Sequence, residues 1–105
     1  MSILDRNIID IINVEGENCF LIISDHLMWN EEHFSFLKDK VNLYIYYLES
    51  GQVYLNTPKA KGKNIVIKLI CKFKPRMSDM IVLDNLKETL KSYKINFIYE
   101  YEDSI

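Results

Sequence analysis

The amino-acid sequence predicts an α+β fold, a two-layer sandwich in which two helices lie mainly on one face of a four-stranded mixed sheet. Short β-branched runs and two long stretches of helical periodicity follow one another in the order ββαβαβ. Each helical stretch has one main apolar arc, and the third predicted strand carries lysines on one face, so that face should be partly solvated. With 105 residues, the chain has the length of one domain, which we expect to span residues 1–105.

Two strands are predicted near the start of the chain, over residues 8–14 and 19–23. Both runs are apolar and β-branched, and residues 15–18 between them supply turn-forming side chains, so the two strands should form a hairpin. The second run is apolar on both of its alternating faces. This strand should therefore lie in the middle of the sheet, or be covered on both sides.

A long helix is predicted to begin after Asn30 and to end at Gly51. Asn30 can accept a hydrogen bond from the first turn, and Glu31 and Glu32 are favoured there by the exposed N–H groups. Glycine is the common residue at a helix C-terminus. The main apolar arc of this helix spans about 100°; it consists of Phe34, Leu37, Val41, Tyr44, Ile45 and Leu48.

Residues 52–63 contain Pro58 and Gly62 and are predicted to be a loop, with a short extended piece at residues 53–55. From residue 65 to residue 73 the apolar period changes to two, which predicts a strand.

The predicted strand ends at Pro75, and Ser78 is the expected N-cap of a second helix. The apolar arc of this helix consists of Val82, Leu83, Leu86, Leu90 and Tyr93. A last strand over residues 97–101 should run parallel to the preceding one, because a helix joins the two.

Charge is distributed unevenly along the chain. Residues 1–50 hold nine acidic and three basic side chains, whereas residues 51–76 hold seven basic and no acidic ones. A basic run of this kind can follow the phosphates of a nucleic acid; its members are Lys59, Lys61, Lys63, Lys68, Lys72, Lys74 and Arg76. However, the pI is about 5.6 and aromatic residues do not alternate with these lysines. We therefore expect a solvated strand face and no nucleic-acid partner.

The cysteines and the apolar stretches indicate the compartment. Cys19 and Cys71 each lie within an apolar run and have neither CxxC nor metal-ligand spacing, so both are predicted to be buried, reduced thiols. No apolar stretch approaches the ~20 residues that span a membrane, and the N-terminus has no basic leader. We expect a cytoplasmic protein without membrane contact, cofactor or metal.

The densest polar cluster lies between the second strand and the first helix. Carboxylates with imidazoles suit acid–base catalysis or metal binding, so one alternative is a small enzyme or metal-binding protein that uses Asp25, His26 and His33. The neighbouring glutamates are equally explained by the helix start, and an Asp-His pair often closes a turn. No HExxH, GxSxG, P-loop or GxGxxG motif occurs. The cluster is therefore predicted to be structural.

The first helix carries a second apolar stripe roughly opposite its main arc. Phe36, Leu43 and Tyr47 fall within about 40° of one another, with Tyr46 beside them. Such a stripe should face water, and a clustered exposed stripe marks an interface. The alternatives are that residues 52–63 fold back over it, or that the helix is embedded between layers. These four residues are candidate contacts for a protein partner or for a second copy in a homodimer.

Four short motifs stand out in the sequence: ISDHL at residues 23–27, WNEEH at residues 29–33, ESGQ at residues 49–52 and AKGK at residues 60–63. With these motifs the chain resembles, over nearly its whole length, a family of short bacterial proteins recorded as a domain of unknown function. The resemblance supports the ββαβαβ order and implies no activity.

The leading hypothesis is a non-enzymatic protein-binding module of the immunity type, which neutralises a toxin partner. It rests on the second apolar stripe and on an analogy of size and class with small acidic immunity proteins. The alternatives are the enzyme or metal protein described above and a purely structural domain. A neighbouring toxin gene would favour the first hypothesis, and an ion bound to the purified protein would favour the second.

Overall fold

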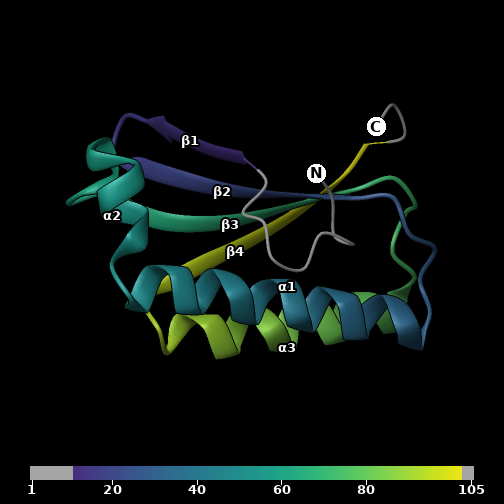
Figure 1. The fold of residues 1–105 in the computed structure, drawn as a ribbon. Helices are drawn as coiled ribbons and strands as arrows, with labels where there is room; N and C mark the ends of the chain where they lie inside the picture. The colour runs from purple at the N-terminus through teal and green to yellow at the C-terminus, as the bar shows by residue number, and fades with distance from the viewer. Residues whose placement is uncertain (1–10, 103–105) are drawn as a thin grey trace.

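A computed structural model describes residues 11–102 of the chain (Figure 1). Its elements are the strands β1 (Ile11–Glu15) and β2 (Asn18–Asp25), the helices α1 (Glu31–Glu49) and α2 (Gln52–Asn56), the 3₁₀ turn η1 (Pro58–Ala60), the strand β3 (Asn64–Cys71), the helix α3 (Met77–Lys91) and the strand β4 (Ile95–Tyr101). Within the described range, no helix combines the length and the apolar character that crossing a membrane requires.

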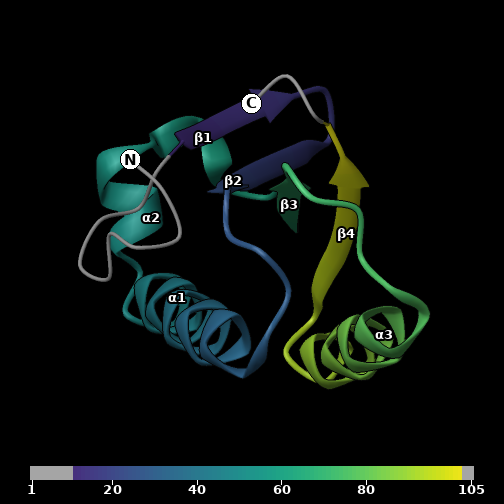
Figure 2. The same cartoon turned by 90° about the vertical axis from the view of Figure 1, so that its right-hand side faces the viewer.

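The four strands form one mixed sheet in the order β1-β2-β3-β4. β1 is antiparallel to β2, whereas β2, β3 and β4 run parallel to one another. Viewed along the helices, α1 and α3 lie side by side on the same face of the sheet (Figure 2). The predicted α+β sandwich with a four-stranded mixed sheet is therefore confirmed, as is the parallel pairing of the last two strands.

The predicted hairpin is present in the described residues. Gly16 and Glu17 form the turn between β1 and β2, and Gly16 has φ 58°, in the left-handed region that favours glycine. Residues 8–10 of the first predicted strand lie outside the described range. β2 has a neighbour on each side, which confirms its predicted central position.

The core lies between the sheet and the two helices. The strands contribute Cys19, Leu21, Ile23, Ile65, Ile67, Leu69, Cys71, Ile95 and Phe97, and the helices contribute Leu37, Val41, Tyr44, Leu83 and Leu90. Val82 and Tyr93, which were expected in the core arc of the second helix, are instead 44% and 49% exposed. These two side chains line the space between α1 and α3, where no helix or strand of residues 11–102 covers them on the outer side.

Residues 52–63 were expected to be a loop with an extended piece, and this prediction was wrong. Gly51 has φ 80°, which turns the chain and lets a new helix begin, since the N–H groups of Tyr54 and Leu55 bond to the Gly51 carbonyl at 3.1 and 3.4 Å. Val53 of this short helix is fully buried. Burial of one side chain against the core therefore decided the local structure.

Ser78 is not the cap of the second helix, because the helix begins at Met77, two residues before the start that a cap at Ser78 predicts. Arg76 occupies the N-cap position, and its backbone N–H donates to Oδ2 of Asp79 at 2.9 Å. A carboxylate three residues into a helix that bonds back to the cap is half of a capping box. β3 also ends earlier than expected, at Cys71, because the Phe73 carbonyl instead accepts a hydrogen bond from Trp29 Nε1.

Cys19 and Cys71 are both buried and free, as predicted. In the β2–β3 register Cys19 lies beside Ile65, and Cys71 lies beside Asp25. Cys71 is six residues beyond Ile65 along β3, so the two cysteines are about 20 Å apart. A disulfide between them is excluded by this separation.

The two thiols should be almost unreactive in the folded protein. Burial raises the pKa of Cys19, and burial together with the nearby Asp25 carboxylate raises the pKa of Cys71 to about 12. Because the thiolate is the reactive form, titration with a thiol reagent at pH 8 should be slow and should reach two equivalents only in denaturant. Rapid labelling of both without denaturant would contradict the buried placement.

Candidate interaction groove and the histidine cluster

Asp25 and His33 form a buried pair at the carboxyl ends of the parallel strands. Asp25 is the last residue of β2, His33 lies in the first turn of α1, and both side chains are fully buried. Nε2 of His33 pairs with Oδ2 of Asp25, while Nδ1 lies 3.1 Å from the Met28 carbonyl oxygen. Oδ1 of Asp25 accepts the Leu27 backbone N–H at 3.1 Å. Every polar atom of the pair therefore has a partner within the fold.

Trp29 extends this pair toward the second helix. Its ring stacks on the His33 ring with centroids 4.1 Å apart, and its Nε1 donates to the Phe73 carbonyl at 2.8 Å. Nη2 of Arg76 donates to the Trp29 carbonyl at 3.2 Å. We call Asp25, Trp29, His33, Arg76 and Asp79 the histidine cluster. It ties the segment that starts α1 to the segment that starts α3.

This geometry suits a structural role better than a catalytic or metal-binding one. Both ring nitrogens of His33 are paired with oxygen atoms of the fold, so neither nitrogen is directed at a ligand. Metal ligation requires a ring nitrogen whose lone pair is directed at the ion. His26, the third predicted member, is exposed rather than buried with Asp25 and His33. Within residues 11–102, no three His, Cys, Asp or Glu side chains are grouped to hold a metal ion.

The ion pair between Arg76 and Asp79 should make stability depend on pH. Hydrogen bonds from the Arg76 guanidinium, at 2.8 and 3.0 Å, hold the pKa of the Asp79 carboxyl below its usual range. The folded state therefore binds this proton less readily than the unfolded state, whose Asp pKa is about 3.9. The stabilisation is present above that pH and is lost as the pH falls through the folded-state pKa.

Asp79→Asn should accordingly lower the melting temperature at pH 7, and the difference from wild type should shrink below about pH 4. Thermal unfolding followed by circular dichroism at both pH values measures this. Glu88→Gln removes an exposed carboxylate that pairs with Lys91 at 3.2 Å and should change little at either pH. An Asp79→Asn deficit that persists unchanged in acid would show that the ion pair is not its origin.

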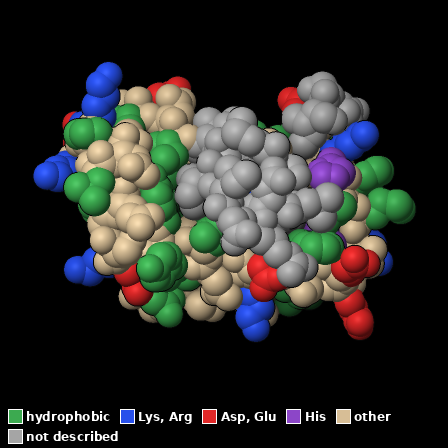
Figure 3. Space-filling model, in the orientation of Figure 1, with side chains coloured by type: hydrophobic (Ala, Val, Ile, Leu, Met, Phe, Trp, Pro, Cys, Tyr) green, Lys and Arg blue, Asp and Glu red, His purple; other side chains and the backbone are tan. Residues whose placement is uncertain are grey.

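The basic run does not form one surface. Lys68 lies on the outer face of β3 and pairs with Glu100 at 3.3 Å, whereas Arg76 belongs to the histidine cluster. Lys59 and Lys61 lie at η1, far along the chain from these. On the face shown in Figure 3, Lys and Arg side chains are spread around the outline of the molecule instead of gathering in a patch.

The second apolar stripe of α1 is only partly open. Tyr47 was expected to face water, but it is 7% exposed and its hydroxyl accepts a hydrogen bond from Nδ2 of Asn56, in α2, at 3.0 Å. That expectation was wrong because α2 packs over this end of the helix. Phe36 and Leu43 are half-buried against the core, and Tyr46 is 64% exposed. A partner-binding role for Phe36, Leu43 and Tyr46 stays a prediction.

A groove lies between α1 and α3 on the side away from the sheet. Its volume is about 370 Å³, and its floor is made by buried side chains such as Val41 and Leu90. Phe34 and Ile45 on one wall and Val82 on the other are apolar and partly exposed. The rim is polar, with Lys38, Asn42, Asn85 and Thr89.

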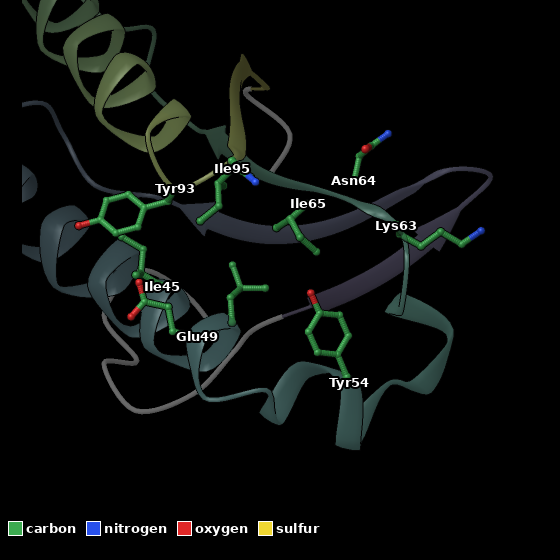
Figure 4. Close-up of a pocket in the computed structure, with 10 residues that line it drawn as sticks. Ile45, Glu49, Tyr54, Lys63, Asn64, Ile65, Tyr93 and Ile95 are labelled. Atoms are coloured by element: carbon green, nitrogen blue, oxygen red, sulfur yellow. The ribbon is translucent and has the colours of Figure 1, made fainter.

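The groove widens into a second hollow of about 390 Å³ at the end of the helices, which we call the end pocket. Tyr54 and Tyr93 stand on opposite sides of it, and Ile65 and Ile95 reach into it from the sheet (Figure 4). The Lys63 side chain points outward from its edge (Figure 4). The end pocket therefore combines aromatic and aliphatic side chains with polar ones, such as Glu49 and Asn64.

Comparison with known families identifies the chain. A family of unknown function, DUF6572, matches residues 1–103. The chain belongs to DUF6572. No curated protein and no solved structure matches this DUF6572 chain.

The four motifs noted in the sequence occupy defined places in this DUF6572 structure. Residues 23–27 end β2 and residues 29–33 begin α1, so both contribute to the histidine cluster. Residues 49–52 make the turn from α1 to α2 at Gly51, and residues 60–63 lead from η1 into β3. Three of the four motifs therefore lie at turns or helix starts, where backbone geometry and capping select the residues.

Neither the burial of Lys40 nor the groove follows from the sequence pattern. Lys40 is fully buried, with its ammonium 5.8 Å from the centroid of the Tyr44 ring. At 100° per residue Lys40 falls between the main arc and the second stripe, so its burial joins the two into one continuous buried face. Hydropathy does not indicate that Lys40 is buried, because lysine is normally an exposed residue.

Proposed function

We propose that this DUF6572 protein is a non-enzymatic protein-binding module whose contact surface is the outer side of its helical layer. The observation that carries the proposal is the apolar groove between α1 and α3. Its wall residue Val82 and its end residue Tyr93 remain open to solvent, although the core beneath them is well packed. Contiguous exposed apolar surface of this kind marks a protein interaction site.

The composition of the surface supports a protein partner. Interfaces have an apolar, aromatic centre within a polar rim, and their binding energy concentrates in a few anchors that fill pockets. The end pocket has tyrosines and isoleucines inside and lysines at its edge, which is this arrangement. Tyr46, exposed on the outer side of α1, adds a further aromatic contact.

We further propose that the partner is a toxin and that the module is of the immunity type. The support is an analogy of size and class: the chain is short, has a net charge of −2, and carries nine acidic residues in its first half. Charged surface steers association with a partner of complementary charge and makes the association rate depend on salt.

The test is to express the products of the two genes that flank this one, each alone and together with the full chain. One product should arrest growth alone, and co-expression should restore growth and yield a stable complex on size-exclusion chromatography. Val82→Glu, in the groove, should weaken the complex, whereas Ile81→Glu, on the same helix but outside the groove, should not. If neither flanking product is toxic or binds, the immunity form of the proposal is wrong.

Leu43→Glu separates the groove from the second stripe of α1. If it weakens the complex while Val82→Glu does not, the contact surface is the stripe. Stoichiometric zinc in the purified protein, lost in His33→Ala, would instead favour the metal-binding alternative.

A further inference from the structure

The groove and the end pocket adjoin one another, because Ile45 and Tyr93 line both, and we call the two together the channel. Along α1 the channel extends from Phe34 to Glu49, fifteen residues apart, which corresponds to about 22 Å. This length matches about four turns of an α-helix. The partner segment should therefore be elongated rather than a single side chain.

The walls of the channel determine which backbone can enter it. Along the groove both walls are helices, whose backbone groups are already bonded within α1 and α3. An extended segment in this apolar channel would bury N–H and C=O groups without partners, whereas a helix satisfies its own. Helices with apolar residues at i, i+3, i+4 and i+7 bind grooves of this kind.

Charge at the rim selects among such helices. Lys38, Lys63 and Lys94 stand at the edges of the channel, against one acidic residue, Glu49. Three positive charges and one negative charge leave a net charge of +2 at the rim. A segment with acidic residues beside its apolar stripe complements this rim, and a basic segment is repelled by it.

Lys94 occupies a strained position. It follows α3 with φ 62°, and its N–H bonds to the Lys91 carbonyl at 2.9 Å; glycine adopts this left-handed conformation more readily than lysine does. Glycine there would relieve the strain but would remove a cation from the rim. A costly lysine at this point is consistent with a binding role, since strain is often retained at functional sites.

From these observations we infer that the channel binds an amphipathic helix of the partner, with acidic residues flanking its apolar stripe and an aromatic side chain for the end pocket. The inference rests on the proposed protein-binding function. In this arrangement the apolar stripe of the partner helix contacts Val41, Ile45 and Val82. Its aromatic side chain lies between Tyr54 and Tyr93, where ring edges and faces can meet.

The probe is a displayed library of 16-residue helical peptides with a fixed apolar stripe and randomised flanking positions, selected against the full chain. Enriched peptides should be rich in Asp and Glu beside the stripe and carry an aromatic residue near one end. Their affinity should fall as salt concentration rises. Peptides with the same composition but a scrambled stripe are the matched control.

Variants of the protein then locate the site. Val82→Glu should lower the affinity of the enriched peptides at least about ten-fold, since it places a negative charge in the apolar wall and opposite the acidic flanks of the peptides. Ile81→Glu, at a residue that is 60% exposed outside the channel, should leave the affinity unchanged. Lys94→Gly should raise the melting temperature of the protein and lower its affinity for the peptides several-fold. A lysine with a purely structural role would not produce this combination.

Three results would overturn the inference: no enrichment of striped over scrambled peptides, enrichment of basic flanks, or equal effects of Val82→Glu and Ile81→Glu. The outcome is separable from that of the proposed function. A flanking-gene product that binds wild type and Val82→Glu equally well would support a protein-binding module and reject the channel as its site. Failure of both the gene products and the peptides would reject both.

Discussion

Asp25→Ala should lower the free energy of unfolding by about 3 kcal/mol, because it leaves the buried Nε2 of His33 without its hydrogen-bond partner and removes buried atoms at the end of β2. The total free energy of unfolding of a small domain is about 5–15 kcal/mol, so the variant should keep only a small part of its stability if the wild type is near the lower value. Urea denaturation followed by circular dichroism measures the change.

Matched variants test the cause of the loss at Asp25. Asp25→Asn can still accept a hydrogen bond from a neutral His33 ring, so it should lose less than Asp25→Ala. His26→Ala, at an exposed neighbour, should stay within about 0.5 kcal/mol of wild type. If Asp25→Ala and His33→Ala were additive in the double variant, the two residues would not be coupled and the pair would not explain the loss.

Trp29→Ala should destabilise the protein by about 3–5 kcal/mol. Trp29 is the single tryptophan of the chain, and it joins segments 44 residues apart through the hydrogen bond of its Nε1 to Phe73. Its removal takes away the stacking surface of His33 and leaves a cavity where two chain segments meet. Chemical denaturation read by circular dichroism is the measurement, since the variant has no tryptophan fluorescence.

Two further variants separate packing from hydrogen bonding at this site. Trp29→Phe keeps an aromatic ring beside His33 but removes the donor to the Phe73 carbonyl, so that bond should account for about 1 kcal/mol of its loss. Met28→Ala, at a side chain that is 67% exposed, should have almost no effect. A comparable loss in Met28→Ala would point to the loop backbone rather than to the tryptophan ring.

The histidine cluster and the groove are linked through the two helices. Asp25 and Trp29 hold the start of α1, and the Arg76 side chain connects Trp29 to the first turn of α3. At this end, therefore, polar contacts link α1 to α3 and help to set the width of the groove. Loss of the cluster should weaken binding in the groove without any change to a groove residue.

Apolar periodicity and helix-capping residues were sufficient to predict much of the local structure. The hairpin turn at Gly16, the Asn30 cap and the alternating core face of β3 were predicted because each depends on residues close together in the sequence. The Asn30 side chain accepts the His33 backbone N–H at 2.9 Å, as a cap should. Where a distant contact competed, the prediction failed, as at residues 53–55, which burial of Val53 made helical.

In the histidine cluster, too, nearby residues could be predicted from the sequence and distant contacts could not. The sequence placed Asp25, His26 and His33 near one another, but all three are compatible with a turn, a metal site or a catalytic site. Only the fold separates them, since it buries Asp25 and His33 as a pair and leaves His26 in solvent. The residues that complete the histidine cluster, Arg76 and Asp79, come from beyond β3.

By itself, the sequence determined the fold class, the element order, the buried free cysteines and the family of this protein. Those features follow from short-range periodicity, from turn residues and from the family-wide pattern of residues. The tertiary structure alone decided which apolar residues of the helices became core and which became surface. Tyr47 is covered by α2, whereas Val82 and Tyr93 border a groove, because burial depends on how far apart packed helices lie, and that distance is set by contacts between residues far apart in the chain.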